Sequence, residues 1–355
     1  MAAVSALIVG CKGTELSADH LAFMRDMNPW GFILFKRNVE TPDQVRALVD
    51  AFRSAVGRDD APVLIDQEGG RVQRLGPPHW PKYPSGRAYS AISANDPLLG
   101  RELTRLGARL MAHDLKSLGI TVDCLPVLDV PVPGSHDIIG DRAYGTTPDI
   151  VASLGRAAAE GLIAGGVLPV IKHIPGHGRA GADSHEALPV VTAGRSELEA
   201  TDFRPFRTLT DMPLAMTAHV VYSAVDPRRP ATTSRKVFKE IIRGSIGYDG
   251  LVMCDDLSMK ALGGTYGERT RASFAAGCDV ALHCNGDIGQ MREIAAETPL
   301  LTGKAKRRAD VALARIAHEP EPFDAKEAAA RFFETMARSQ PASSTGFAAN
   351  HALSV

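Results

Sequence analysis

The sequence predicts an α/β fold: a single (β/α)8 barrel of the TIM type with extra helices at its C-terminal end. Eight short apolar runs alternate with segments of helical character, and titratable residues follow many of the runs. Strands that are apolar on both faces and alternate with helices form a parallel sheet covered by helices, and eight such units close into a barrel. An open doubly wound sheet is the alternative, but no GxGxxG motif follows the first run.

The eight expected strands are apolar or rich in β-branched residues and are bounded by Gly, Pro, Asn or Asp. They cover Ala6–Cys11, Gly31–Phe35, Pro62–Asp66, Val122–Asp129, Val167–His173, Pro213–His219, Gly250–Asp255 and Asp279–Cys284. The first run lacks the positively charged start and the cleavage site of a signal peptide, so we interpret it as a strand.

The expected helices lie between and after these strands. Thr41–Val56 opens with Thr-Pro-Asp, which suits a helix N-terminus. Asp96–Leu118 has leucines spaced three and four residues apart, which place one apolar stripe along a helix. Two further helices, Gly303–Ala317 and Ala325–Ser339, follow the last strand and are expected to pack outside the barrel.

The length and charge of the chain are typical of a globular enzyme: 355 residues with a formal net charge of -1. We predict one domain over residues 1–339 and a disordered tail over residues 340–355, which is rich in Ser, Ala and Asn. The low net charge, without a Lys/Arg run interleaved with aromatic residues, argues against a nucleic-acid partner. No apolar stretch approaches the roughly 20 residues that span a bilayer, so no membrane association is expected.

The cysteines are odd in number, mostly far apart and mainly within apolar runs: Cys11, Cys124, Cys254, Cys278 and Cys284. Such cysteines are expected to be reduced and buried. Because disulfides belong to oxidising compartments, the pattern favours a cytoplasmic protein. We expect a monomer that needs no metal or other cofactor.

Polar residues gather where the predicted strands end, which is where barrel enzymes place their catalytic groups. They occur in Asp66–Arg71, at Asp129 with Gly140–Arg142, at Lys172-His173, at His219 and at Asp255-Asp256. One aspartate at a strand end is more often a helix cap than a catalyst. Five strand ends with polar residues favour an active site.

The most informative loop runs from Lys172 through His173 and His177 to Asp183 and His185. A loop this rich in titratable groups seldom serves packing alone. In one interpretation the histidines and Asp183 bind zinc or iron. In the other, Asp183 orients His185 as a proton-transfer dyad, while Lys172 and His173 bind substrate hydroxyls. The spacing matches no HExxH helix, which argues against the metal.

A second informative segment is the apolar run that delivers Asp255 and Asp256 at its C-terminal end. A carboxylate there can attack the anomeric carbon of a sugar or bind a cation. We expect Asp256 to have a supporting role, such as capping the next helix.

Together these segments resemble glycoside hydrolase family 3, in particular its single-domain cytoplasmic β-N-acetylglucosaminidases of peptidoglycan recycling. The resemblance covers roughly the first 300 residues. It rests on six motifs in order: Gly31–Asn38, Asp66–Arg74, Gly140–Arg142, Lys172–Gly178 with Asp183–His185, Met216–His219 and Cys254–Met259. By this resemblance Asp255 is the nucleophile and His185, held by Asp183, is the acid/base. The residues implied to grip the terminal N-acetylglucosamine are Asp66, Arg74, Arg142, Lys172 and His173.

One residue departs from the family pattern, because Cys254 stands where Ser or Thr usually precedes the nucleophile. A thiol is a weaker hydrogen-bond donor, so we expect weaker local support of Asp255 than in the family pattern. The resemblance implies a retaining enzyme that removes N-acetylglucosamine β-linked to 1,6-anhydro-N-acetylmuramic acid in muropeptides. Three alternatives stay open: phosphate in place of water as the acceptor, a silent sugar-binding barrel, and a metal-dependent hydrolase.

Overall fold

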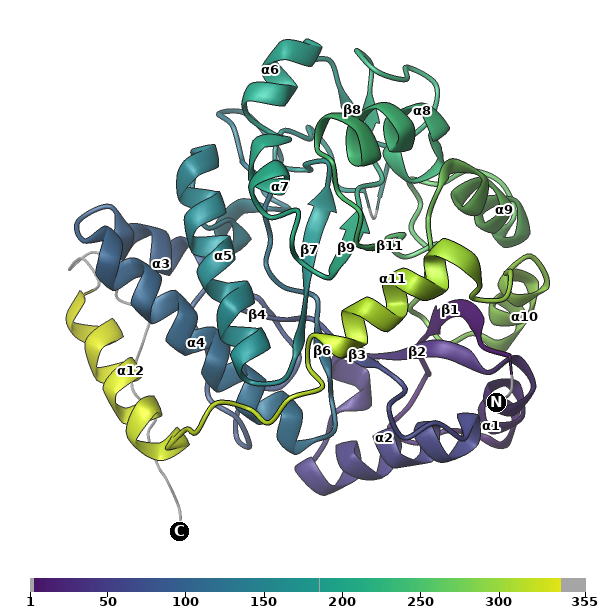
Figure 1. Ribbon diagram of the computed structural model, residues 1–355, viewed down its shortest axis with the longest axis horizontal. Coiled ribbons are helices and arrows are strands. Elements are labelled where there is room, and N and C mark those ends of the chain that lie inside the picture. Colours follow the sequence, from purple (N-terminus) through teal and green to yellow (C-terminus); the bar gives the residue numbers. More distant parts are fainter. Residues whose placement is uncertain (1–2, 185, 340–355) are drawn as a thin grey trace.

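The computed structural model describes residues 3–184 and 186–339, and a sheet of eight parallel strands forms its centre (Figure 1). The strands lie side by side in their order along the chain. They are β1 (Ser5–Val9), β2 (Pro29–Leu34), β3 (Val63–Ile65), β6 (Val122–Asp123), β7 (Leu168–Ile174), β9 (Leu214–Thr217), β11 (Leu251–Met253) and β12 (Ala281–His283). Each strand overlaps one of the eight predicted runs, so these predictions are confirmed.

The sheet is nearly closed into a barrel. Strand β1 pairs with β12, and β12 in turn meets β11 through a parallel bridge between Met253 and Val280. The backbone nitrogen of Cys254 also donates to the carbonyl oxygen of Val280 at 3.1 Å. An open doubly wound sheet has no such contact between its edge strands, so the barrel prediction is confirmed.

Helices cover the outside of the sheet (Figure 1). They are α1 (Ala18–Met27), α2 (Pro42–Val56), α3 (Gly86–Ser93), α4 (Pro97–Ser117), α5 (Pro148–Ala164), α6 (Arg195–Ala200), α7 (Arg204–Thr208), α8 (Arg235–Val237), which continues as a π-helix over Phe238–Ser245, α9 (Tyr266–Ala276), α10 (Ile288–Ala296), α11 (Gly303–Ala314) and α12 (Ala325–Ser339). Short 3-10 helices span Lys36–Asn38, Gly140–Arg142 and Ala231–Thr233. The side chain of Thr41 caps α2 at the helix start that the sequence predicts, and the side chain of Asp96 caps α4.

The C-terminal helices pack as predicted, although one helix was missed. Helix α12 lies along α4, where Phe332 is fully buried. Helix α10 follows β12 directly, a position where we predicted no helix. The fourth strand is shorter than predicted and ends at Asp123, although the chain beyond it still meets β7 through a parallel bridge between Val127 and Lys172. The predicted tail, 340–355, lies outside the described residues.

Two small sheets at the C-terminal ends of the barrel strands were not predicted. Strands β4 (Gln67–Gly69) and β5 (Val72–Gln73) form an antiparallel hairpin directly after β3. Strands β8 (Val190–Val191) and β10 (Val221–Tyr222) pair in parallel. The β4–β5 hairpin matters most here, because it carries charged residues into the site described below.

The cysteines are free thiols, and all except the half-buried Cys284 are buried. The prediction of reduced, buried cysteines therefore holds for four of the five. In the part of the chain that the structure describes, no helix combines the length and the apolar character needed to cross a membrane.

Candidate active site

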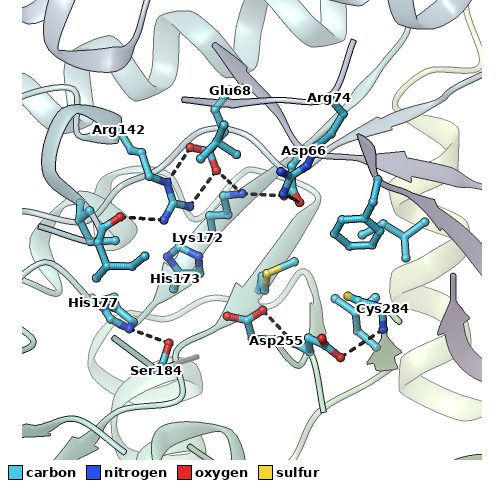
Figure 2. A pocket seen from close by; sticks show the side chains of 18 of the residues that line it. Asp66, Glu68, Arg74, Arg142, Lys172, His173, His177, Ser184, Asp255 and Cys284 are labelled. Atoms are coloured by element: carbon cyan, nitrogen blue, oxygen red, sulfur yellow. Dashed lines mark hydrogen bonds and ion pairs between the residues drawn. The ribbon is translucent and has the colours of Figure 1, made fainter. Parts of the chain in front are cut away.

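A cavity of about 200 Å³ lies at the C-terminal ends of the barrel strands (Figure 2). Six of the residues predicted from the sequence line it: Asp66, Arg74, Arg142, Lys172, His173 and Asp255. They come from segments that are as much as 189 positions apart in the chain, and the barrel brings them together. Further lining residues that received no predicted role include Phe35, Glu68, Arg71, Ser184 and Cys284, and His177, considered above only as a metal ligand, lines the cavity as well.

The described residues include only one member of the predicted dyad of Asp183 and His185. Asp183 is described, and its carbonyl oxygen accepts hydrogen bonds from the backbone nitrogens of Glu186 and Ala187. Asp183 is not among the residues that line the cavity, but its neighbour Ser184 is. His185 lies outside the described residues. The geometry of the Asp183–His185 pair therefore stays a prediction.

Asp66 joins three of the elements that surround the cavity. It follows β3, and its Oδ1 accepts a hydrogen bond from Nζ of Lys172 in β7 at 3.0 Å. Its Oδ2 accepts from Nη2 of Arg74, just after β5, at 2.9 Å. Burial alone would raise the pKa of Asp66, but Lys172 and Arg74 outweigh burial and lower it below its usual range. The carboxylate is therefore ionised in the folded protein near neutral pH.

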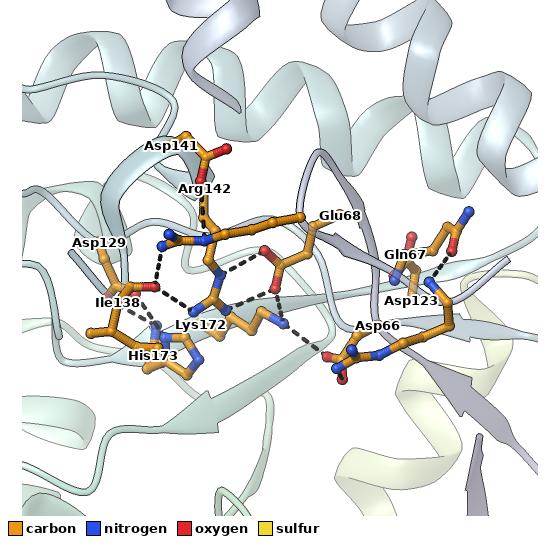
Figure 3. Close-up of polar contacts among 12 residues, drawn as sticks. Asp66, Gln67, Glu68, Asp123, Asp129, Ile138, Asp141, Arg142, Lys172 and His173 are labelled. Atoms are coloured by element: carbon orange, nitrogen blue, oxygen red, sulfur yellow. Dashed lines mark hydrogen bonds and ion pairs between the residues drawn. The ribbon is translucent and has the colours of Figure 1, made fainter. Parts of the chain in front are cut away.

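Glu68, on strand β4, is the centre of a second ion cluster that sequence reasoning missed. Its carboxylate accepts from Nε and Nη2 of Arg142, each at 2.8 Å, and pairs with Nζ of Lys172 at 2.6 Å (Figure 3). Burial raises the pKa of Glu68, but Arg142 and Lys172 overcome that effect and lower it to about 2. The sequence signal was its place two residues after Asp66 in the polar run, although nothing there indicated which partner it would take.

The cations of this cluster also stay charged. Burial would lower the pKa of Lys172, but Asp66 and Glu68 raise it above its usual range. The pKa of Arg142 is raised in the same way: Glu68 more than offsets the effect of burial. This part of the cavity wall is thus a set of ionised, mutually paired groups.

Asp129 supports the histidines of the loop that follows β7. Its Oδ2 lies 2.7 Å from Nδ1 of His173, and its Oδ1 accepts from the backbone nitrogens of His173 and His177. Burial raises the pKa of Asp129, but His173 outweighs it and brings the pKa to about 2. The sequence placed Asp129 at a strand end without a role, and the structure makes it the residue that orients His173.

His177 reaches from this loop toward the segment that carries Asp183. Its Nε2 lies 3.2 Å from the hydroxyl oxygen of Ser184 (Figure 2). Burial, and then the charge of His173, lowers the pKa of His177 to about 4. The ring is therefore neutral near pH 7, and it links the two parts of the loop by a neutral hydrogen bond.

Both aspartates that follow β11 line the cavity, but their side chains make different contacts. Asp255 lines the cavity, and its Oδ1 accepts from the backbone nitrogen of Asp256 at 2.8 Å. Asp256 accepts from the backbone nitrogens of Ser258 and Cys284, so it ties the strand end to the residue after β12. The expected supporting role of Asp256 is confirmed. It does not cap a helix, however, because the next helix, α9, is capped by Thr265.

Cys254 makes a contact that the sequence did not indicate. Its sulfur accepts a hydrogen bond from the backbone nitrogen of Leu282 at 3.1 Å, across the β11–β12 junction. Burial raises the pKa of the thiol, so the sulfur stays protonated. The thiol thus acts as an acceptor in strand pairing, which differs from the donor role considered above for this position.

A resident metal was the alternative interpretation of the histidine loop. Within residues 3–184 and 186–339, no group of three or more His, Cys, Asp or Glu side chains is arranged to hold a metal ion. The metal interpretation also included His185, which is outside those ranges.

Comparison with known proteins identifies the class. The model of the glycosyl hydrolase family 3 N terminal domain matches residues 10–318. The chain is 41% identical over 283 residues to a β-hexosaminidase of Alkalilimnicola ehrlichii, covering 79% of this chain and 80% of that protein. It is 39% identical over 282 residues to a β-hexosaminidase of Pseudomonas aeruginosa, covering 79% of this chain and 82% of that protein.

Solved structures agree with these relatives. NagZ from Neisseria gonorrhoeae, in complex with N-trifluoroacetyl-D-glucosamine, superposes with a TM-score of 0.81 at 29% identity and covers 95% of this chain and 97% of that one. A family 3 β-N-acetylglucosaminidase from Paenibacillus superposes with a TM-score of 0.82 at 30% identity, covering 94% of this chain and 67% of that one. The chain belongs to glycoside hydrolase family 3. Within that family it groups with the bacterial β-hexosaminidases.

Proposed function

We propose that the protein is an exo-acting, retaining β-N-acetylglucosaminidase that removes the non-reducing terminal N-acetylglucosamine from muropeptides. The observation that carries this proposal is the meeting of Asp255 with the Asp66, Lys172 and Arg142 cluster around one cavity. Such a cavity holds a reactive carboxylate beside groups that bind hydroxyls. It also suits a single terminal sugar, because its volume is only about 200 Å³.

The proposed reaction has two steps and retains the anomeric configuration. In the first, Asp255 attacks the anomeric carbon while protonated His185 gives its proton to the leaving oxygen, which forms a glycosyl-enzyme ester. In the second, neutral His185 takes a proton from water, the water attacks the same carbon, and the ester bond to Asp255 breaks. Asp183 orients the imidazole and stabilises its charged form.

The sugar is held by the five residues that the family resemblance implies: Asp66, Arg74, Arg142, Lys172 and His173. Four of them are already fixed by ion pairs to one another or to Glu68, and His173 is fixed by Asp129. Such preorganisation lowers the entropy lost when substrate binds. The aglycone proposed is 1,6-anhydro-N-acetylmuramic acid with its peptide, and the compartment proposed is the cytoplasm, in which the chain acts as a monomer without a cofactor.

The test is release of p-nitrophenol from its β-N-acetylglucosaminide at pH 7 by wild type, Asp255→Ala and His185→Ala. We expect Asp255→Ala to lose at least about three orders of magnitude in kcat, because it removes the nucleophile. His185→Ala should lose less, because p-nitrophenol leaves without help from an acid. Asp59→Ala is the matched control, since Asp59 is exposed in the turn before β3, at the opposite end of that strand from Asp66.

Different results would favour other functions. Sugar binding without turnover by wild type would make the protein a binding module, and unchanged activity in Asp255→Ala would remove Asp255 as the nucleophile. Loss of activity on chelation would favour the metal-dependent alternative. Release of sugar 1-phosphate when inorganic phosphate is present would identify phosphate, in place of water, as the acceptor.

A further inference from the structure

We propose that Glu68 sets the charge of the wall that holds the terminal sugar, so that this position accepts an uncharged sugar and rejects a terminal sugar that itself carries an anionic group. Glu68 belongs to the cavity lining and is paired with two of its cations, and its side chain is only 3% exposed. The part of this proposal that concerns sugars rests on the proposed function. The part that concerns binding of a simple anion does not.

The first step of the argument is the way Arg142 uses its hydrogen-bond donors. A guanidinium has five N–H groups in a planar fork. Nε and Nη2 of Arg142 both donate to Glu68, and Nη1 donates to the carbonyl oxygen of Ile138 at 3.2 Å. A guanidinium offers two two-pronged edges to a phosphate or carboxylate, and the edge formed by Nε and Nη2 of Arg142 is occupied by Glu68.

The second step is the same count of hydrogen-bond donors for Lys172. Its ammonium group has three N–H donors, and two of them are directed at Oδ1 of Asp66 and Oε1 of Glu68. The side chain is 2% exposed, so one donor is left for a ligand inside the cavity. A single donor suits a hydroxyl oxygen and is a poor partner for an anion that needs several.

The third step is the balance of charge. Three cations of the wall, Arg74, Arg142 and Lys172, face two carboxylates, Asp66 and Glu68 (Figure 2). Within this cluster the excess is one positive charge, and removing the charge of Glu68 would make it two; Asp255, elsewhere in the lining, is the same in every variant compared below. Buried cations without a carboxylate are costly, and they recruit an anion when one is available. Glu68 thus acts as a built-in anion that keeps an external one out.

The consequence for specificity follows from these contacts. A neutral sugar can accept from the remaining N–H groups without displacing any ion pair. A sugar with a phosphate or carboxylate would have to compete with Glu68 for Arg142, or add its charge to two carboxylates that are already there. We therefore expect discrimination against anionic sugars beyond that caused by their size.

The direct test measures binding of inorganic phosphate by calorimetry to wild type, Glu68→Gln and Glu68→Asp at pH 7. Glu68→Gln keeps the size but removes the charge, so it should bind phosphate at least about tenfold more tightly than wild type. Glu68→Asp keeps the charge and should resemble wild type. The double variant Glu68→Gln/Arg142→Gln restores the original excess of one charge, and its affinity should return toward that of wild type.

The proposal is overturned if folded Glu68→Gln binds phosphate no better than wild type, or if Glu68→Asp binds it as well as Glu68→Gln does. If Glu68→Gln does not fold, the proposal is tested on the wild type instead, by comparing how tightly it binds a charged and an uncharged sugar. N-acetylglucosamine 6-phosphate should bind at least about tenfold more weakly than the uncharged 6-O-methyl ether, which controls for bulk. Equal binding of these two ligands would refute the proposal. If N-acetylglucosamine itself does not bind, the proposed function fails while the phosphate measurement still tests Glu68.

Discussion

Oδ2 of Asp129 lies 2.7 Å from Nδ1 of His173, and this contact ties the loop after β6 to the end of β7. Asp129 is fully buried and also accepts from two backbone nitrogens. A buried carboxylate with this many donors is ionised and immobile. It therefore fixes the ring of His173, which lines the cavity, before any sugar arrives.

Replacing Asp129 by Asn should destabilise the fold, because the charge that pairs with His173 is lost inside the protein. We expect the free energy of unfolding to fall by roughly 3 kcal/mol at pH 7, as measured by urea denaturation. The pKa of Asp129 is lowered to about 2 in the folded state, so its contribution is present above pH 4 and is lost as the pH falls toward 2. The difference in free energy of unfolding between wild type and Asp129→Asn should therefore narrow as the pH falls from 4 toward 2. The exposed control Asp59→Asn should follow wild type, and a gap that is constant down to pH 2 would contradict this account.

The contact between His177 and Ser184 leads to a kinetic prediction. Ser184→Ala removes a neutral hydrogen bond that connects the fixed start of the loop to the segment next to Asp183. Such a bond contributes about 1 kcal/mol, so we expect kcat to fall by about fivefold with little change in KM. The pH dependence of kcat should keep its shape between pH 5 and 8, because His177, with a pKa of about 4, is neutral throughout. Ser54→Ala, at an exposed position on α2, serves as the control, and a shifted acid limb in Ser184→Ala would show that the contact does more than position the loop.

The sequence was sufficient for the barrel and for most of the cavity wall, because both depend on local patterns. Buried strands are continuous apolar runs, and catalytic groups follow strand ends. The roles of Glu68 and Asp129 were not predicted, since each depends on a partner more than 40 positions away that the folded barrel brings close. The β4–β5 hairpin was missed because its strands are too short and too polar to show the alternation of apolar and polar residues that is typical of a strand.

A third prediction concerns Asp114 on α4, far from the predicted site residues in the sequence. Burial raises its pKa to about 6, although a hydrogen bond from the hydroxyl of Tyr83 at 2.7 Å opposes the shift. A raised folded-state pKa stabilises the protein below pH 4, and that contribution is lost as the pH rises through 6. Asp114→Asn should therefore raise the Tm at pH 8 by roughly 2–4 °C relative to wild type, and by less at pH 5. Tyr83→Phe should have the opposite sign, lowering the Tm more at pH 8, because the ionised carboxylate loses its donor. Equal effects of Asp114→Asn at both pH values would contradict the assignment.

The last prediction addresses the residue that departs from the family pattern. Cys254 accepts from the backbone nitrogen of Leu282, while Asp255 is supported separately by the nitrogen of Asp256. Cys254→Ser keeps an acceptor at that position, so we expect kcat for the p-nitrophenyl substrate to stay within about twofold of wild type. Cys254→Ala leaves a buried N–H without a partner and should cost about 1–3 kcal/mol in urea denaturation, again with kcat little changed. A loss of more than tenfold in kcat for a fully folded Cys254→Ser would mean that the thiol acts on Asp255 itself, and that the departure from the family pattern bears on the chemistry as well as on strand pairing.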